Sequence, residues 1–262
     1  MHTRNETIPA ASGNQLAASI DTPSDGEPAA YAIFSHFFTG NKQTPAAKRI
    51  SKRLTEHGYG VVRFDYPGLG ASSGDLKDQT FTSNVLDLIS VTDWMGEHLS
   101  APQLMVGHSL GGAAVLRAAS EFSDRLGSLA AIATLGAPFD PAHAVYQFHD
   151  HIDAIDEHGE LTFELVGRTM TLGRPLLDDL ANTNPETYLP HLHTPLLILH
   201  SPVDTTVGIS SAQLIFQLTR YPKSLICLDG IDHLATKPGA GAYIGDLIAT
   251  WASAYITPVP AT

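Results

Sequence analysis

Residues 107–111 carry the pattern G-x-S-x-G, and their surroundings limit the folds open to this chain more than any other stretch. The pattern follows a short apolar run at 104–106 and precedes an alanine-rich segment at 113–120 that is expected to be helical. A serine on so sharp a turn has strained backbone, and the positions two before and two after it, both glycine here, have no room for a side chain. We therefore predict a nucleophile elbow, in preference to an ordinary glycine-rich turn, with the hydroxyl of Ser109 exposed at a helix N-terminus, where free amides favour negative charge.

Short apolar runs alternate with helical patterns along most of the chain. The apolar runs predicted to be strands lie at 15–20, 29–35, 59–66, 104–106, 129–135, 195–199 and 224–228, and the predicted helices lie at 45–57, 81–99, 113–120, 209–220 and 240–255. This alternation argues for an α/β fold, with a mostly parallel sheet covered by helices on both faces. In such sheets, ligands bind at the carboxyl ends of the strands.

The alternation breaks at 138–190. This segment has weak sheet periodicity, contains a possible hairpin around 161–172, and falls between two predicted strands. We interpret it as a lid or cap inserted into a single domain that spans residues 1–262, because long connections without sheet periodicity commonly cover functional sites.

Composition excludes several classes of partner. Hydrophobic residues make up 43% of the chain and charged residues 16%, as in globular proteins, and the net charge of −12 argues against a surface for nucleic acid or anionic membranes. A small uncharged substrate is expected. Residues 1–13 lack the apolar core of a signal peptide, and no apolar run approaches the roughly 18 residues that a membrane span needs, so a cytoplasmic protein is predicted. The sequence leaves the oligomeric state open.

Cysteine and histidine usage gives little support to metal chemistry. Cys227 is the only cysteine and lies in the apolar run at 224–228, so we predict a buried thiol and no internal disulfide. Two histidine pairs lack a third ligand at a known metal-site spacing and are interpreted as solvated or packed side chains. These pairs are His149 with His151 and His191 with His193.

A serine nucleophile needs a base, and the base needs an acid that orients it. Asp204 follows the predicted strand at 195–199, and His233 lies in the loop after the run at 224–228, which gives the order Ser, Asp, His. Each of the three residues follows the carboxyl end of an apolar strand, so we expect them to meet at one edge of the sheet. We predict Ser109 as nucleophile, Asp204 as orienting acid and His233 as base.

Other side chains compete for these roles. Asp140 is the second choice for the acid, whereas Asp232, adjacent to His233, is expected to cap its loop or face solvent. His108 is expected to pack beside the elbow, and His36 to fix its own loop by hydrogen bonds.

An acyl-transfer site also needs donors for the oxyanion. The backbone amide of Leu110, directly after the nucleophile, is one candidate. The second should come from the loop after the strand that ends at Ser35, where Phe37 and Phe38 are both possible and Phe38 is preferred.

Several segments together resemble the α/β-hydrolases, and more narrowly the hydrolase half of bifunctional α/β-hydrolase/OsmC-type proteins. These segments lie at 36–40, 63–70, 107–114, 136–138, 200–204 and 232–234. The resemblance implies an eight-stranded, mostly parallel sheet, a triad of Ser109, Asp204 and His233, and no cofactor. The loop at 36–40 is similar to the H-G-F-T-G loop of cinnamoyl esterases, in which the phenylalanine supplies an oxyanion donor. Phe38 stands at that place, and Phe37 replaces a small residue, which bears on the width of the acyl pocket.

The residues and the resemblance favour a serine hydrolase that cleaves small uncharged carboxylic esters through an acyl-enzyme. Hydroxycinnamoyl (feruloyl-type) esterase, thioesterase, peptidase and perhydrolase activities would use the same triad and remain alternatives. A hypothesis of another class is a binding protein that keeps the fold without turnover.

Overall fold

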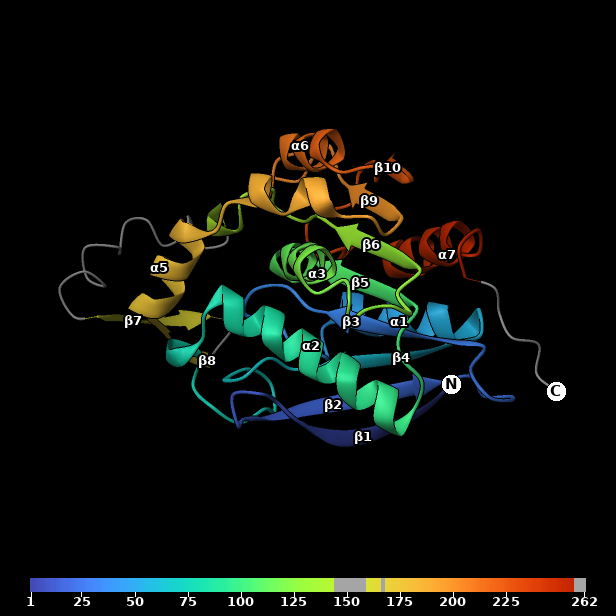
Figure 1. The fold of residues 1–262 in the computed structure, drawn as a ribbon, viewed down its shortest axis with the longest axis horizontal. Coiled ribbons are helices and arrows are strands. Elements are labelled where there is room, and N and C mark those ends of the chain that lie inside the picture. Colours follow the sequence, from blue (N-terminus) through green and yellow to red (C-terminus); the bar gives the residue numbers. More distant parts are fainter. Residues whose placement is uncertain (144–158, 166–167, 257–262) are drawn as a thin grey trace.

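An eight-stranded sheet runs through the centre of the molecule (Figure 1), in the order β1-β2-β4-β3-β5-β6-β9-β10. The computed structural model describes residues 1–143, 159–165 and 168–256. Both pairings of β2, with β1 and with β4, are antiparallel, and all other pairings are parallel. The strands are β1 (His2–Pro9), β2 (Gln15–Thr22), β3 (Ala30–Ser35), β4 (Tyr59–Phe64), β5 (Leu104–His108), β6 (Ala131–Leu135), β9 (Leu196–His200) and β10 (Lys223–Cys227). The predicted fold class is confirmed.

Helices cover both faces of the sheet. Figure 1 shows α1 (Pro45–Glu56) and α7 (Ala240–Ala252) together on one side, and α2 (Phe81–His98) and α3 (Leu110–Glu121) on the other. The helix α6 (Ser210–Leu218) packs into the same core as α2 and α3. Sequence sets these boundaries: Pro45 occupies the first turn of α1, and Thr80 and Ser83 exchange the reciprocal hydrogen bonds of a capping box at the start of α2.

The central strands β4, β5, β6 and β9 are buried at every position because each of their faces meets a layer of helices. In β3, Ile33 joins the core with α2 and α3, whereas its neighbour Phe34 joins the core with α1 and α7. The same division separates Ile198 of β9 from Leu197 and Leu199. The sheet therefore lies between two separate hydrophobic layers.

The stretch from 138 to 190 leaves the sheet after β6 and returns to it at β9. Its described part includes an antiparallel hairpin of β7 (Glu160–Leu165) and β8 (Arg168–Gly173), which confirms the hairpin expected around 161–172. An additional helix, α5 (Arg174–Asn182), follows the hairpin and was not predicted. Short 3₁₀ turns are η1 (Leu76–Asp78), η3 (Pro185–Thr187) and η4 (Leu189–His191).

The prediction of a buried Cys227 is wrong. Cys227 ends β10, which is the edge strand of the sheet, and its side chain is exposed. An edge strand has a neighbour on one side only, so an apolar run there need not be buried. Within the described ranges, no helix combines the length and apolar character that crossing a membrane requires.

Candidate active site

Ser109 occupies the sharp turn between β5 and α3. Its backbone lies in the left-handed half of conformational space, with φ 54° and ψ −124°, and its amide donates to the carbonyl of Leu135 at 2.8 Å. A Cβ atom at Gly107 would lie 2.5 Å from the carbonyl oxygen of Gly111, and one at Gly111 would overlap the carbonyl oxygen of Ser35. The two glycines therefore allow the strand and the helix to approach while Ser109 takes the strained position.

His233 lies in the loop after β10, and its ring reaches the serine. Its Nε2 atom is 3.0 Å from the Oγ of Ser109. The turn that carries this imidazole is closed by Asp232, whose carboxylate accepts hydrogen bonds from the amides of Leu234 and Thr236. The prediction that Asp232 caps its loop is thus confirmed.

Asp204 completes a continuous line of hydrogen bonds. Its Oδ2 atom is 2.7 Å from the Nδ1 of His233, and its Oδ1 accepts from the amides of Thr206 at 2.8 Å and Val207 at 2.9 Å. Burial alone would raise the pKa of this carboxyl, but the hydrogen bonds from His233, Val207 and Thr206 together lower it below its usual range. Asp204 is therefore an anion that can hold one tautomer of the imidazole.

Two further histidines hold the backbone of the segments that carry this line of groups. His108 donates from Nε2 to the carbonyl of His233 at 2.7 Å, and His200 donates from Nε2 to the carbonyl of Val207 at 2.8 Å. Burial lowers the pKa of both imidazoles, that of His108 to about 3. Both are neutral donors at physiological pH. The packing of His108 beside the elbow was predicted, but the role of His200, at the end of a strand and four residues before Asp204, was not.

Gly136 lies against the side chains of His233 and Asp204. It follows β6 with φ +56°, and a Cβ atom there would lie 3.2 Å from the Nδ1 of His233 and 3.4 Å from the Oδ2 of Asp204. A side chain at this position would press on the hydrogen bond between the two groups.

The loop after β3 is fixed from two sides. His36 donates from Nδ1 to the carbonyl of Phe37 at 2.8 Å and accepts from the amide of Tyr66 at 3.3 Å, which confirms that it holds its loop. A buried ion pair joins Lys42 to Asp65, and the Asp65 carboxylate also accepts from the Lys42 amide at 2.6 Å. The segment that carries Phe38 is thereby anchored to the loop after β4.

The amide of Leu110 is the first of α3, so it has no acceptor within the helix. It follows Ser109 directly, and Phe38 lines the same cleft as the serine hydroxyl. Leu110 therefore adjoins the serine in sequence, and Phe38 faces the same cleft.

A cleft of about 990 Å³ opens above Ser109 and His233. No Asp, Glu, Lys or Arg is among its lining residues in the described part of the chain, and the β7–β8 hairpin contributes to its wall through Thr169 and Met170. The remaining lining residues are Phe37, Phe38, Thr39, Gly40, Asn41, Thr44, Gly68, Leu69, Gly70, Pro138, His143, Thr205, Thr206, Val207 and Leu234.

The other candidates lie elsewhere. The Oδ1 atom of Asp140 accepts from the amide of Ala142 at 2.9 Å, whereas the Nδ1 of His233 is bonded to Asp204. His149 and His151 fall outside the described residues, and the described ranges contain no group of three or more side chains suited to hold a metal ion.

Comparison with known proteins agrees with the fold. Residues 33–163 match the sequence profile of the family described as alpha/beta hydrolase fold. The esterase domain of a Rhodothermus marinus protein is 37% identical, with a TM-score of 0.77 over 98% of this chain and 100% of that one. Est1E from Butyrivibrio proteoclasticus, solved with ferulic acid, is 21% identical with a TM-score of 0.79 over 96% and 99% of the two chains, which shows the fold alone.

Palmitoyl-protein thioesterase ABHD10, a mitochondrial protein of Mus musculus, is 33% identical over 102 residues, which make up 39% of this chain and 33% of that protein. The chain spans about a third of the length of the ABHD10 relatives it matches. The chain belongs to the α/β-hydrolase family.

Proposed function

We propose that this protein is a serine hydrolase that cleaves small uncharged carboxylic esters through an acyl-enzyme on Ser109. The observation that carries the proposal is the line of two hydrogen bonds, 3.0 Å from the serine Oγ to His233 Nε2 and 2.7 Å from His233 Nδ1 to Asp204 Oδ2. This geometry lets one imidazole accept the serine proton while a carboxylate stabilises the resulting imidazolium.

The reaction would proceed in two halves. The Oγ of Ser109 attacks the carbonyl carbon while His233 accepts its proton, and the tetrahedral oxyanion is held by the amides of Leu110 and Phe38. His233 then passes the proton to the departing alcohol as the carbon–oxygen bond breaks. In the second half, water attacks the acyl-enzyme, His233 takes its proton and returns it to Ser109, and the acid leaves.

The surroundings of the site favour an uncharged substrate and a covering role for the insertion. The lining of the cleft carries no charged side chain among the described residues. The described part of 138–190 contributes Pro138, His143, Thr169 and Met170 to that lining. We therefore propose that this segment acts as a lid within one hydrolase domain of residues 1–262. A cytoplasmic location stays a prediction from the sequence, whereas the ABHD10 relatives are named as mitochondrial.

Thioester hydrolysis is the second candidate, and the similarity to ABHD10 favours it. A thiolate leaves more readily than an alkoxide, so the same three groups suffice. Kinetics on paired oxygen and sulfur esters with a common acyl group would separate the two activities, and hydroxycinnamoyl esters belong in the same panel because of the loop at 36–40.

The decisive experiment compares Ser109→Ala with Ser120→Ala, a matched change near the end of α3, where the Ser120 hydroxyl donates to the carbonyl of Leu116. With 4-nitrophenyl acetate, we expect the first variant to lose at least about a thousandfold in kcat and the second to keep it. A fluorophosphonate probe should label the wild type and not Ser109→Ala. Turnover by Ser109→Ala at the wild-type rate would refute the mechanism, and a wild type that neither turns over nor is labelled would favour a binding protein.

A further inference from the structure

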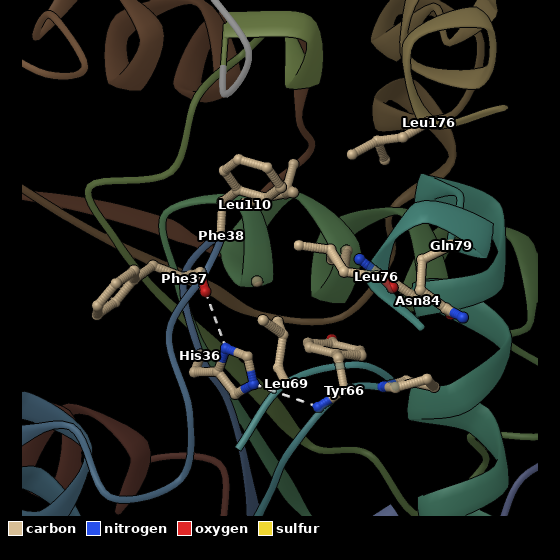
Figure 2. Close-up of a pocket in the computed structure, with 13 residues that line it drawn as sticks. His36, Phe37, Phe38, Tyr66, Leu69, Leu76, Gln79, Asn84, Leu110 and Leu176 are labelled. Carbon is tan, nitrogen blue, oxygen red and sulfur yellow. Dashed lines mark hydrogen bonds between the residues drawn. The ribbon is translucent and has the colours of Figure 1, made fainter. Parts of the chain in front are cut away.

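A second, much smaller cavity of about 20 Å³ lies beside the cleft (Figure 2). Phe37, Phe38 and Leu69 line both spaces, so the cavity and the cleft are neighbours. The small cavity also touches Leu110, and thus lies next to both proposed oxyanion donors. A substrate group that extends from the cleft past these shared residues would enter this cavity.

Most of the lining is apolar and comes from separate elements. Leu76 comes from η1, Leu110 and Ala114 from α3, and Leu176 from α5. Figure 2 shows the side chains of Phe38, Leu110, Leu76 and Leu176 arranged around this space, with Gln79 and Asn84 at the side of α2.

Polar groups in this lining are engaged elsewhere, with one exception. The hydroxyl of Tyr66 is 2.7 Å from the Oγ of Ser35, and the Oε1 of Gln79 accepts from the Oγ of Ser83 at 3.1 Å. Both ring nitrogens of His36 are used within its loop. The Oδ1 of Asn84, in contrast, is buried and finds no hydrogen-bond partner among the described residues.

A buried amide oxygen without a hydrogen-bond partner destabilises the folded protein, because it has lost its bonds to water. Occupation of the cavity by a donor would remove that destabilisation. The volume suffices for one group about the size of a water molecule. Lys, Arg, Asp and Glu are absent from the described lining, so a charged group would enter without a counter-charge.

We propose that this cavity is a subsite for the far end of the acyl group, and that it selects acyl groups ending in an uncharged hydroxyl, which donates to Asn84. The inference rests on the proposed esterase function and names the substrate class of that site. A terminal methyl group would fit the same space but would leave the Asn84 amide unpaired. Because Phe38 and Leu69 line both the cleft and the cavity, we expect only acyl chains long enough to extend past these two side chains to reach it.

Paired 4-nitrophenyl esters that differ only in a terminal hydroxyl or methyl group test the proposal over a series of chain lengths. For the wild type, we expect the hydroxyl-to-methyl ratio of kcat/KM to stay near one for short chains and to rise about tenfold at the length that reaches the cavity. In Asn84→Leu, which keeps the side-chain shape and removes the polar group, the rise should disappear. Asn182→Leu is the matched control, because Asn182 is exposed on α5 and bonds to the carbonyl of Asp178.

Binding measured without turnover separates this proposal from the esterase proposal. Calorimetry on Ser109→Ala, with and without Asn84→Leu, would compare alkanamides with their terminally hydroxylated counterparts. A hydroxyl preference of about tenfold that depends on Asn84 would support the subsite even if no ester were cleaved. Esters cleaved with the same ratio at every length in wild type and Asn84→Leu would overturn the subsite and leave the esterase intact. An absent preference among the amides would overturn it as well, with trapped water as the occupant.

Discussion

His108 is a donor that stays neutral, and this property suits its position. Its ring centre is 5.5 Å from that of His233, which becomes positive during the proposed reaction. A charged donor at this distance would oppose that protonation, whereas an imidazole with a pKa of about 3 holds the backbone of His233 without adding charge. Its Nδ1 is buried and has no partner in the described ranges, which strengthens the preference for the neutral form.

We predict that His108→Phe, which removes the donor, lowers kcat about tenfold to a hundredfold and changes KM little, because the base loses its anchor and the cleft keeps its lining. His108→Gln can present a donor near the position of Nε2 and should recover most of the rate. Steady-state kinetics on a common ester decide the matter. A purely packing role would give the opposite ranking, with the aromatic replacement the more active.

At the scale of elements, α2 contains a buried carboxyl group, one oxygen of which has no hydrogen-bond partner among the described residues. Asp87 is 1% exposed, and its Oδ2 atom finds no hydrogen-bond partner in the described residues. Burial raises the pKa of this carboxyl to about 7. The folded state therefore holds a proton that the unfolded state releases near pH 4, and the free energy of unfolding decreases as the pH rises from about 4 to about 7.

The prediction for Asp87→Asn follows from this decrease in the free energy of unfolding with rising pH. The variant and the wild type should be similar in free energy of unfolding below pH 4. At pH 8 the variant should be more stable by up to about 4 kcal/mol, because each tenfold difference in proton affinity between the folded and unfolded states is worth about 1.4 kcal/mol. Urea unfolding at several pH values measures the difference. Asp93, which also lies on α2, forms an exposed ion pair with Arg125. Asp93→Asn breaks this pair, serves as control and should have a small effect on the free energy of unfolding at every pH. A difference independent of pH would contradict the assignment.

Local sequence predicted the elements whose burial is uniform. The strands β3, β4, β5, β6 and β9 have apolar neighbours on both faces, so their sequences are mostly apolar. The order of Ser109, Asp204 and His233 along the chain pointed to the residues that the structure brings within hydrogen-bonding distance. β1 escaped prediction because it is an edge strand with one buried residue, Ile8, in an otherwise exposed or half-exposed run. Its position depends on pairing with β2, which no local pattern encodes.

Contacts between distant segments were equally hard to foresee. The anchoring of Val207 by His200, and the contact of Gly136 with the side chains at 204 and 233, arise only after separate strands are aligned in the sheet. Exposure of Cys227 has the same origin, because being at an edge is a property of strand order. Sequence therefore predicted the chemical groups of the candidate site better than the residues that hold them.

At the scale of the whole molecule, the net charge of the chain and the lining of the cleft both disfavour an anionic substrate. The chain carries 27 acidic and 15 basic residues, for a net charge of −12, and the described cleft lining has no charged side chain. An anionic substrate would meet repulsion on approach and no partner on arrival.

We therefore predict that an ester with a carboxylate in its acyl group is cleaved with a kcat/KM about tenfold or more below that of its uncharged methyl ester. The gap should narrow as salt is added, because salt screens the long-range part of the repulsion. Initial rates for both esters over a range of sodium chloride concentrations test this. Equal rates, or a gap that widens with salt, would show that the surface charge does not select the substrate.

The contribution of Leu176 to the small cavity, and of Thr169 and Met170 to the cleft, has a consequence for engineering and for divergence among relatives. The proposed catalytic groups follow strands of the central sheet, whereas these three wall residues lie on a hairpin and a helix outside that sheet. Transplanting the stretch 159–182 between homologues should transfer part of the preference for particular esters and leave the chemical machinery in place. Substrate specificity can thus change without substitutions in the hydrophobic core around the sheet.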